Sequence, residues 1–205
     1  MAKQRRIGIY GGTFDPIHMG HLIAAEQARI HFALDEVRFL PNGKPPHKMG
    51  PCATKAQRVE MLRRAIVPNP YFSMDLREVE SKRPSYSYET MHTLRAENPD
   101  EHLFFLMGED SLLEIESWYR WQDLLQCVEP VVLCRPQPAG QKPKGNLQEK
   151  IAVLRAQGFT VHALTRYPVQ ISSSEIRSDL RQGKSVRYLV PDAVFSYIQE
   201  EGIYV

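Results

Sequence analysis

The sequence has few cysteines, little net charge and no long apolar run. Its three cysteines, Cys52, Cys127 and Cys134, form no C-x-x-C pair, which argues against a disulfide framework and favours reduced thiols. A formal net charge of +2 over 205 residues produces no strong overall field, so we expect no nucleic-acid surface. No apolar stretch approaches the roughly 20 residues that span a bilayer, and no secretory segment is recognisable near the start. We therefore expect a cytoplasmic protein without a membrane anchor.

Strand-like apolar runs alternate with segments of helical period along the chain. This alternation predicts an α/β fold, a Rossmann-like doubly wound parallel sheet with right-handed crossovers. We expect one domain over residues 1–205, with a helical C-terminal part from about residue 172. The expected strands are Arg6–Tyr10, Val37–Leu40, Tyr71–Met74, Leu103–Met107, Val131–Leu133 and Thr160–Ala163. The expected helices are Gly20–Ala33, Thr54–Val67, Ser87–Glu97, Leu147–Gln157 and Pro191–Glu201. A further helix is expected to open at Ile171–Arg177, continue through Leu180 and stop at Gly183, and another to start with the acidic residues after Gly108.

Two segments rich in Pro, Gly and basic residues interrupt this alternation, Pro41–Pro51 and Arg135–Gly145. Loops of this length in a compact domain are often lids or binding loops. For the second segment, a plain surface connection explains the composition equally well.

A glycine turn with two histidines follows the first expected strand, from Gly11 to His21. The carboxyl end of a strand is where an open α/β sheet places its ligand crevice. Glycines let backbone amides approach an anion, and the start of a helix favours phosphate. His18 and His21 are three residues apart, so both project from one face of the first helical turn, and Gly20 between them leaves room for a flat group.

Three other kinds of site fit this turn less well. A dehydrogenase would carry G-x-G-x-x-G and an acidic residue near the end of the second strand, but the pair Asp35-Glu36 comes before that strand. A Walker-type loop is excluded because the chain has no G-x-x-x-x-G-K-[ST]. Zinc is disfavoured because no third ligand stands at a suitable spacing from the two histidines.

The segment GGTFDPIHMGH resembles the G-G-T-F-D-P-x-H-x-G-H signature of the nicotinate-nucleotide adenylyltransferase family at all eleven positions. The H-x-G-H part alone is less specific, because pantetheine-phosphate adenylyltransferases and cytidylyltransferases also carry it. Near the other end, ISSSEIR resembles the family's phosphate-binding I-S-x-[ST]-x-I-R, and GEDS resembles its G-x-D-[SV], whose aspartate meets ribose hydroxyls. The role of Glu109 in the latter element stays open. From the residues alone, the serine motif is equally a capped helix start with an exposed arginine.

Three further elements extend the resemblance. Trp118-Tyr119 resembles the position where family members stack a tryptophan on the pyridine ring, whereas Trp121 is expected to pack. Ser85-Tyr86-Ser87 resembles the S-Y-T turn whose amides receive the nicotinate carboxylate, with serine in place of threonine. Pro45-Pro46-His47-Lys48 resembles the basic P-P-H-[KR] loop, for which a solvated lysine is the alternative explanation. The pyridine site implied by the resemblance comprises Ser85, Tyr86, Ser87, Trp118 and Tyr119.

The resemblance implies transfer of AMP from ATP to nicotinate mononucleotide, with release of pyrophosphate. His18, His21 and Arg177 would be catalytic, and Mg²⁺ would accompany ATP without protein side-chain ligands. A homo-oligomer is compatible with the sequence. Another H-x-G-H transferase, or a nucleotide-binding module without turnover, remains the alternative. The implied ATP site comprises Gly11, Gly12, Thr13, Phe14, Gly20, Lys48, Gly108, Asp110, Ser172, Ser174 and Arg177.

Overall fold

The protein folds around a parallel sheet whose strand order is β3-β2-β1-β4-β5-β6 in a computed structural model, which describes residues 4–43, 52–134, 145–166 and 169–205. Neighbouring strands are parallel throughout. The strands are β1 (Arg5–Gly12), β2 (Glu36–Pro41), β3 (Phe72–Met74), β4 (Glu101–Gly108), β5 (Glu129–Leu133) and β6 (His162–Leu164). This order, which reverses direction at β1, confirms the doubly wound sheet predicted from the sequence.

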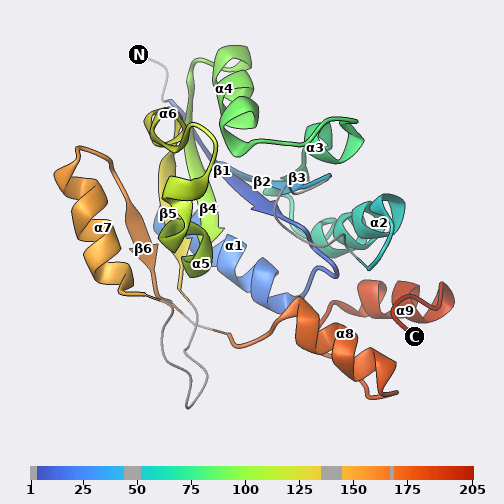
Figure 1. Ribbon diagram of the computed structural model, residues 1–205. Helices are drawn as coiled ribbons and strands as arrows, with labels where there is room; N and C mark the ends of the chain where they lie inside the picture. The colour runs from blue at the N-terminus through green and yellow to red at the C-terminus, as the bar shows by residue number, and fades with distance from the viewer. Residues whose placement is uncertain (1–3, 44–51, 135–144, 167–168) are drawn as a thin grey trace.

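Helices lie on both faces of the sheet (Figure 1). They are α1 (Met19–His31), α2 (Lys55–Ile66), α3 (Arg77–Glu80), α4 (Ser87–Glu97), α5 (Glu109–Leu113), α6 (Trp121–Cys127), α7 (Leu147–Ala156), α8 (Ser173–Arg181) and α9 (Asp192–Glu200). A 3-10 turn covers Ile115–Ser117. Every helix expected from the sequence is present, and α4 has the predicted bounds.

Two hydrophobic cores fill the spaces between the sheet and its helices. Alternate residues of β4 serve the two cores, since side chains of a strand point to opposite faces. Phe104 and Leu106 pack on the side of α1, α2, α8 and α9, whereas Leu103, Phe105 and Met107 pack on the side of α4, α6 and α7. The continuous apolar run of β4 is thus explained by burial on both faces.

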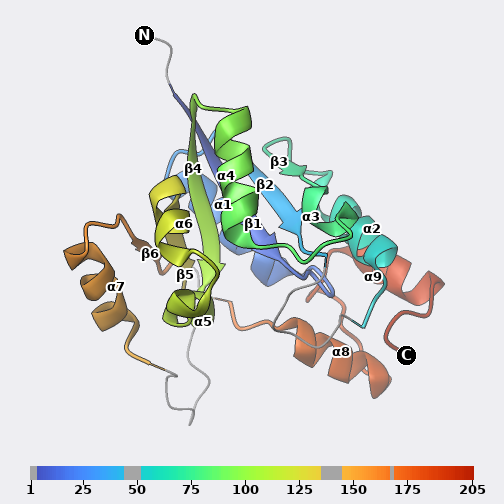
Figure 2. The same ribbon diagram turned by 45° about the horizontal axis from the view of Figure 1, so that its top comes forward.

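The C-terminal part of the chain is helical, as the fold prediction expected, and contains α8 and α9. They lie together on the side of the molecule that holds α1 and α2, and α9 contacts α2 directly (Figures 1 and 2). Local signals set their starts, because the Ser172 hydroxyl accepts a hydrogen bond from the backbone amide of Glu175 at 3.2 Å and Pro191 precedes α9.

The short helices α3 and α6 were not expected. They have four and seven residues, too few for a helical period to stand out in the sequence. The boundaries of β6 also differ slightly, since the strand begins at His162 rather than at Thr160. The three cysteines are free thiols, as expected. Within the described ranges, no helix has both the length and the apolar character needed to cross a membrane.

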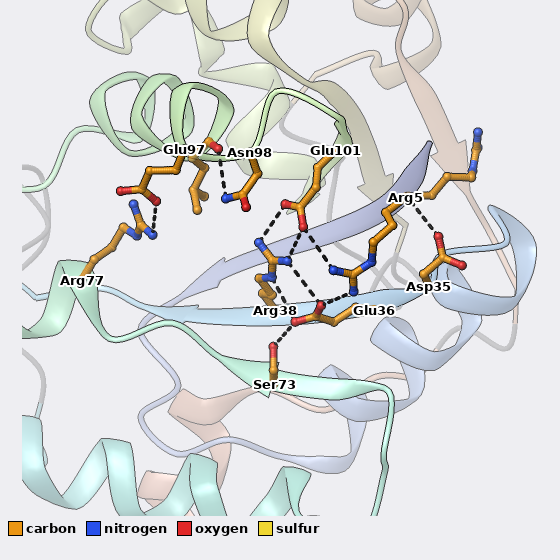
Figure 3. A network of polar contacts seen from close by, with 11 residues as sticks. Arg5, Asp35, Glu36, Arg38, Ser73, Arg77, Glu97, Asn98 and Glu101 are labelled. Carbon is orange, nitrogen blue, oxygen red and sulfur yellow. Dashed lines mark hydrogen bonds and ion pairs between the residues drawn. The ribbon is translucent and has the colours of Figure 1, made fainter. Parts of the chain in front are cut away.

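A network of ion pairs joins the strands near their amino ends (Figure 3). The Arg38 guanidinium contacts a Glu101 carboxylate oxygen at 2.6 Å and a Glu36 carboxylate oxygen at 2.9 Å. The Asp35 carboxylate accepts a hydrogen bond from the backbone amide of Arg6 at 2.8 Å. The acidic pair Asp35-Glu36 therefore stabilises the amino edge of the sheet and lies away from its carboxyl edge, which agrees with the argument against a dehydrogenase.

Candidate functional site

The candidate site lies at the carboxyl ends of β1 and β4, where the strand order reverses. β1 ends at Gly12 and leads into the turn that precedes α1, while β4 ends at Gly108, which precedes the first turn of α5. Neighbouring parallel strands end at the same edge of the sheet, so the glycine turn and the Gly108–Asp110 segment lie side by side at the carboxyl edge, where an open α/β sheet places its ligand crevice. Asp110 is exposed there.

The glycine turn is held by aromatic packing beneath it. Phe14 is buried, adopts a left-handed φ of 49°, and lies edge-on to the His21 ring with centroids 5.2 Å apart. A Cβ atom at Gly12 would come within 2.8 Å of the Phe14 ring. Glycine at position 12 is therefore required by this internal packing, in addition to any close approach of a ligand to the backbone.

The two histidines stack on one another at the start of α1. Their ring centroids are 3.6 Å apart and their planes differ by 24°. His18 is only 1% exposed, whereas His21 is partly exposed. The Cβ of an alanine at Gly20 would lie 3.0 Å from Nδ1 of His18. The flat group that Gly20 accommodates is thus the His18 imidazole itself.

A hydrogen bond fixes the tautomer of neutral His21. The backbone amide of His18 donates to Nδ1 of His21 at 3.3 Å. Since a backbone N–H can only donate, Nδ1 acts as the acceptor and the proton of the neutral ring is on Nε2. His21 therefore presents an N–H donor at Nε2.

Asp15 anchors the turn from below. Its buried carboxylate accepts hydrogen bonds from the backbone amides of Cys52 and Ala53 at 2.8 and 3.0 Å, and from the hydroxyl of Tyr204 at 2.7 Å. Burial, and then the hydrogen bond to the Asp15 carboxylate, raise the pKa of Tyr204 above its usual value. The Tyr204 phenol consequently stays protonated and remains a donor to Asp15.

A fully buried arginine of α2 supports the same turn. The Arg58 guanidinium donates to the backbone carbonyl oxygens of Thr13 at 2.7 Å and Asn42 at 2.9 Å. Burial lowers the pKa of Arg58, and the Asp15 carboxylate opposes that effect. Arg58 thereby ties the glycine turn to the chain that leaves β2.

Helix α8 docks onto the glycine turn. Nη1 of Arg177 donates to the backbone carbonyl oxygen of Asp15 at 2.6 Å, and the Ser173 hydroxyl donates to that of Pro16 at 2.9 Å. The Arg177 side chain remains 23% exposed. The hydroxyls of Ser172 and Ser174 are 3.2 Å apart at the start of α8. The structure thus brings together the two motifs that the sequence places at opposite ends of the chain.

The two segments expected to hold a pyridine ring also meet. The rings of Tyr86 and Tyr119 lie 4.9 Å apart, and Tyr119 is 51% exposed. Trp118 is partly buried and meets Phe105 edge-on at 6.3 Å. Trp121 packs against Phe159 in the core, which confirms its expected packing role.

Among the expected site residues, Lys48 lies outside the described residues. Reasoning from the sequence named neither Asp15, Arg58 nor Tyr204 as site residues. Asp15 belongs to the segment GGTFDPIHMGH, so the motif could have marked it as a residue of the site. Nothing local marked Arg58 or Tyr204, because their contacts with the turn join distant parts of the chain.

Comparison with known proteins agrees with this geometry. The sequence model of the cytidylyltransferase-like family matches residues 9–179, so the chain belongs to this class of nucleotidyltransferases. Within that class, the chain belongs to the nicotinate-nucleotide adenylyltransferase family. It is 39% identical over 209 residues to the probable nicotinate-nucleotide adenylyltransferase of Pseudomonas aeruginosa, covering 98% of this chain and 97% of the relative. It is 42% identical over 211 residues to that of Aeromonas salmonicida, covering 97% and 96%.

Solved structures show the same fold at low sequence identity. A Plasmodium falciparum nicotinic acid mononucleotide adenylyltransferase complexed with NaAD matches with a TM-score of 0.76 and 20% identity, over 98% of this chain and 97% of that one. The same enzyme complexed with APC matches with a TM-score of 0.73 and 19% identity over the same shares of the two chains. These matches confirm the α/β architecture.

Proposed function

We propose that this chain transfers AMP from ATP to nicotinate mononucleotide, giving nicotinate adenine dinucleotide and pyrophosphate in NAD biosynthesis. The observation that supports it most directly is the docking of α8 on the glycine turn through Arg177 and Ser173. This contact brings the glycine turn and the start of α8 together at one edge of the sheet, which supports the proposal that both bind one triphosphate. The family membership favours a pyridine nucleotide as the second substrate.

In the proposed reaction, a phosphate oxygen of the mononucleotide attacks the α-phosphorus of ATP. The bond from that phosphorus to the oxygen bridging to the β-phosphorus breaks, and pyrophosphate leaves with the bonding electrons. No protein nucleophile is needed, so catalysis depends on orientation and on donors placed where negative charge develops.

His21 is the better placed of the two imidazoles to meet the triphosphate. It is partly exposed, and its Nε2 donor is fixed by the amide of His18. The His18 ring stacks on the His21 ring and so fixes its orientation. Because His18 is buried, its own ring would have to rotate away from His21 to contact the phosphates. Arg177, Ser172 and Ser174 would hold the leaving pyrophosphate from the start of α8.

The groups gathered at the crevice suit phosphate oxygens better than a metal ion. Around the glycine turn and the start of α8 they are imidazole, guanidinium, hydroxyl and backbone amide groups, and Asp110 adds a carboxylate at the end of β4, whereas Mg²⁺ prefers a full set of oxygen ligands and retains water. We therefore propose that Mg²⁺ enters with ATP and is held by phosphate oxygens. Its chemistry would be to neutralise charge on the departing pyrophosphate. In the described part of the chain, no group of three or more His, Cys, Asp or Glu side chains is arranged to hold a metal ion.

The pyridine ring would lie between the Ser85–Ser87 turn and Trp118-Tyr119. Tyr86 and Tyr119 already form one aromatic surface, and stacking of a ring on an aromatic side chain contributes on the order of 1–3 kcal/mol. Within the described residues, no side chain caps the first amides of α4, which begins at Ser87. Those amides suit the carboxylate of nicotinate better than a neutral amide.

The test is a comparison of pyrophosphate release with four substrate pairs. ATP or CTP is combined with nicotinate mononucleotide or nicotinamide mononucleotide, at matched concentrations. We expect rapid release with ATP and nicotinate mononucleotide, slower release with the nicotinamide compound, and little release with CTP. Binding of ATP without any pyrophosphate release would contradict the proposal and would instead indicate a nucleotide-binding protein without turnover.

A further inference from the structure

A buried carboxyl group outside the crevice contacts the helix that follows the pyridine turn. Glu78 of α3 is 7% exposed, and its Oε1 accepts a hydrogen bond from the Thr90 hydroxyl of α4 at 2.7 Å. Burial raises the pKa of Glu78, and the Thr90 hydrogen bond opposes that shift. A buried carboxyl is costly unless it is hydrogen-bonded, so this contact holds α3 and α4 in one relative position.

Thr90 also contacts Tyr86, the residue just before the helix, so the position of Thr90 affects that of Tyr86. Its backbone amide donates to the carbonyl oxygen of Tyr86 at 3.2 Å, and Tyr86 immediately precedes α4. The Ser85 hydroxyl approaches the backbone carbonyl oxygen of Glu78 at 3.5 Å. The Ser85–Ser87 turn is thus held to α3 directly through Ser85, and through Tyr86 by way of Thr90.

Helix α3 is itself fixed to the body of the protein. Nζ of Lys55 donates to the carbonyl oxygens of Val79 at 2.8 Å and Ser81 at 3.3 Å. Gly43 packs directly on the carbonyl oxygen of Glu78, and a Cβ atom at this glycine would clash with it. Since α3 is anchored to α2 and to the chain leaving β2, it can serve as a fixed support for the turn.

We propose that the Glu78–Thr90 pair is a positioning device for the pyridine substrate. By fixing Tyr86 and the first amides of α4, the pair sets the direction in which these amides meet the carboxylate of the mononucleotide. Neither side chain contacts the substrate, so both act through the Ser85–Ser87 turn. This inference rests on the proposed function, because it assigns that turn to the mononucleotide.

The test uses Thr90→Val, which removes the hydroxyl donor and nearly preserves the shape of the side chain. We expect the KM for nicotinate mononucleotide to rise about tenfold, as loss of one buried hydrogen bond implies, while the KM for ATP stays within about twofold. The preference for nicotinate over nicotinamide mononucleotide should fall. Thr90→Ser restores the hydroxyl and should restore the wild-type KM.

Thr93→Val is the matched control. It makes the same change on the same helix, where the exposed Thr93 hydroxyl donates only to the Glu89 carbonyl oxygen. It should leave both KM values unchanged. A Thr90→Val enzyme with the wild-type KM for the mononucleotide, an equal rise in both KM values, or a failure of Thr90→Ser to rescue would overturn the positioning role.

Amide hydrogen exchange separates this inference from the proposed function, because it needs no substrate. In Thr90→Val, a peptide spanning the turn and the start of α4 should exchange faster than in the wild type, and in Thr93→Val it should not. Unchanged protection in Thr90→Val would overturn the inference. Absence of pyrophosphate release from the wild-type enzyme would overturn the proposed function, whatever the exchange shows.

Discussion

Nη1 of Arg177 donates a hydrogen bond to the backbone carbonyl oxygen of Asp15 at 2.6 Å, although 162 positions separate the two residues in the chain. The same guanidinium lies 3.9 Å from a carboxylate oxygen of Asp15. One side chain therefore fixes the glycine turn to α8 and brings positive charge to the crevice. A planar guanidinium can hold a carbonyl and still offer further N–H donors to phosphate, which an ammonium group does less well.

Replacement of Arg177 by alanine should lower kcat by about 100-fold or more, because in the proposed reaction Arg177 is a charged donor to the leaving pyrophosphate. Arg177→Lys should recover only part of the lost kcat, because lysine keeps the positive charge but lacks the planar set of N–H donors of a guanidinium. Steady-state pyrophosphate release measures both variants. Lys184→Ala, which removes an exposed lysine 3.5 Å from Asp179 just after α8, is the control and should behave as wild type. Normal kcat in Arg177→Ala would contradict this role.

His21→Ala should cut kcat by about 100- to 1000-fold, in the range seen when one donor to a developing negative charge is lost. The melting temperature should change little, because the His21 side chain is only partly buried. His31→Ala provides the control, since His31 is exposed in the last turn of the same helix. Turnover and thermal unfolding are measured on the same preparations. Equal turnover of His21→Ala and His31→Ala would show that His21 has no catalytic role.

The sheet, the glycine turn and the start of the helix after Ser172 were predictable from the sequence because their signals are local. Apolar runs such as Leu103–Met107 indicated strands, and the residues from Ser87 to Glu97 indicated α4. The glycine turn and the Ser172 cap each occupy a few consecutive residues. Alternation of strands and helices then placed both motifs at the carboxyl edge of the sheet, where the structure shows them in contact.

The supports of the site were not predictable, because they are contacts across long stretches of chain. Tyr204 meets Asp15 across 189 positions, and Arg58 meets Thr13 across 45. A tyrosine near the end of the chain and an arginine inside a helix look like ordinary surface residues in the sequence. Only the packing of α2 and the C-terminal segment beneath the turn reveals that both are buried.

Tyr204→Phe should destabilise the protein by about 1–3 kcal/mol, because the buried Asp15 carboxylate loses a hydrogen-bond donor. The difference in unfolding free energy between the wild type and Tyr204→Phe should have its full size at neutral pH. The pKa of Tyr204 is raised above its ordinary value of 10 in the folded protein, so its stabilising contribution is present below pH 10 and is lost as the pH rises further. The difference in unfolding free energy between the two proteins should therefore shrink above pH 10. Denaturant unfolding at several pH values tests this, and a constant difference would contradict it.

Arg38→Met should separate stability from catalysis. Arg38 is 16% exposed and binds Glu36 and Glu101 near the amino edge of the sheet (Figure 3), whereas the glycine turn follows the carboxyl end of β1. Its loss leaves two carboxylates close together with the more exposed Arg5 as the remaining arginine that contacts both, which should cost about 2–3 kcal/mol, less than for a fully buried pair. The KM values for ATP and the mononucleotide should not change at a temperature where the variant is folded.

The pH dependence of the Arg38→Met variant follows from Glu36. Burial acts to raise the pKa of Glu36, but hydrogen bonds from Arg38 and Ser73, together with the positive charges of Arg38 and Arg5, hold it below the ordinary value of 4.5. A lowered pKa gives stability that is present above pH 4.5 and is lost as the pH falls through the folded-state pKa. The gap in unfolding free energy between wild type and Arg38→Met should therefore be largest near neutral pH and should narrow on acidification below pH 4.5. If the difference in unfolding free energy instead grows as the pH falls, the Arg38 contacts are not what lowers the pKa of Glu36.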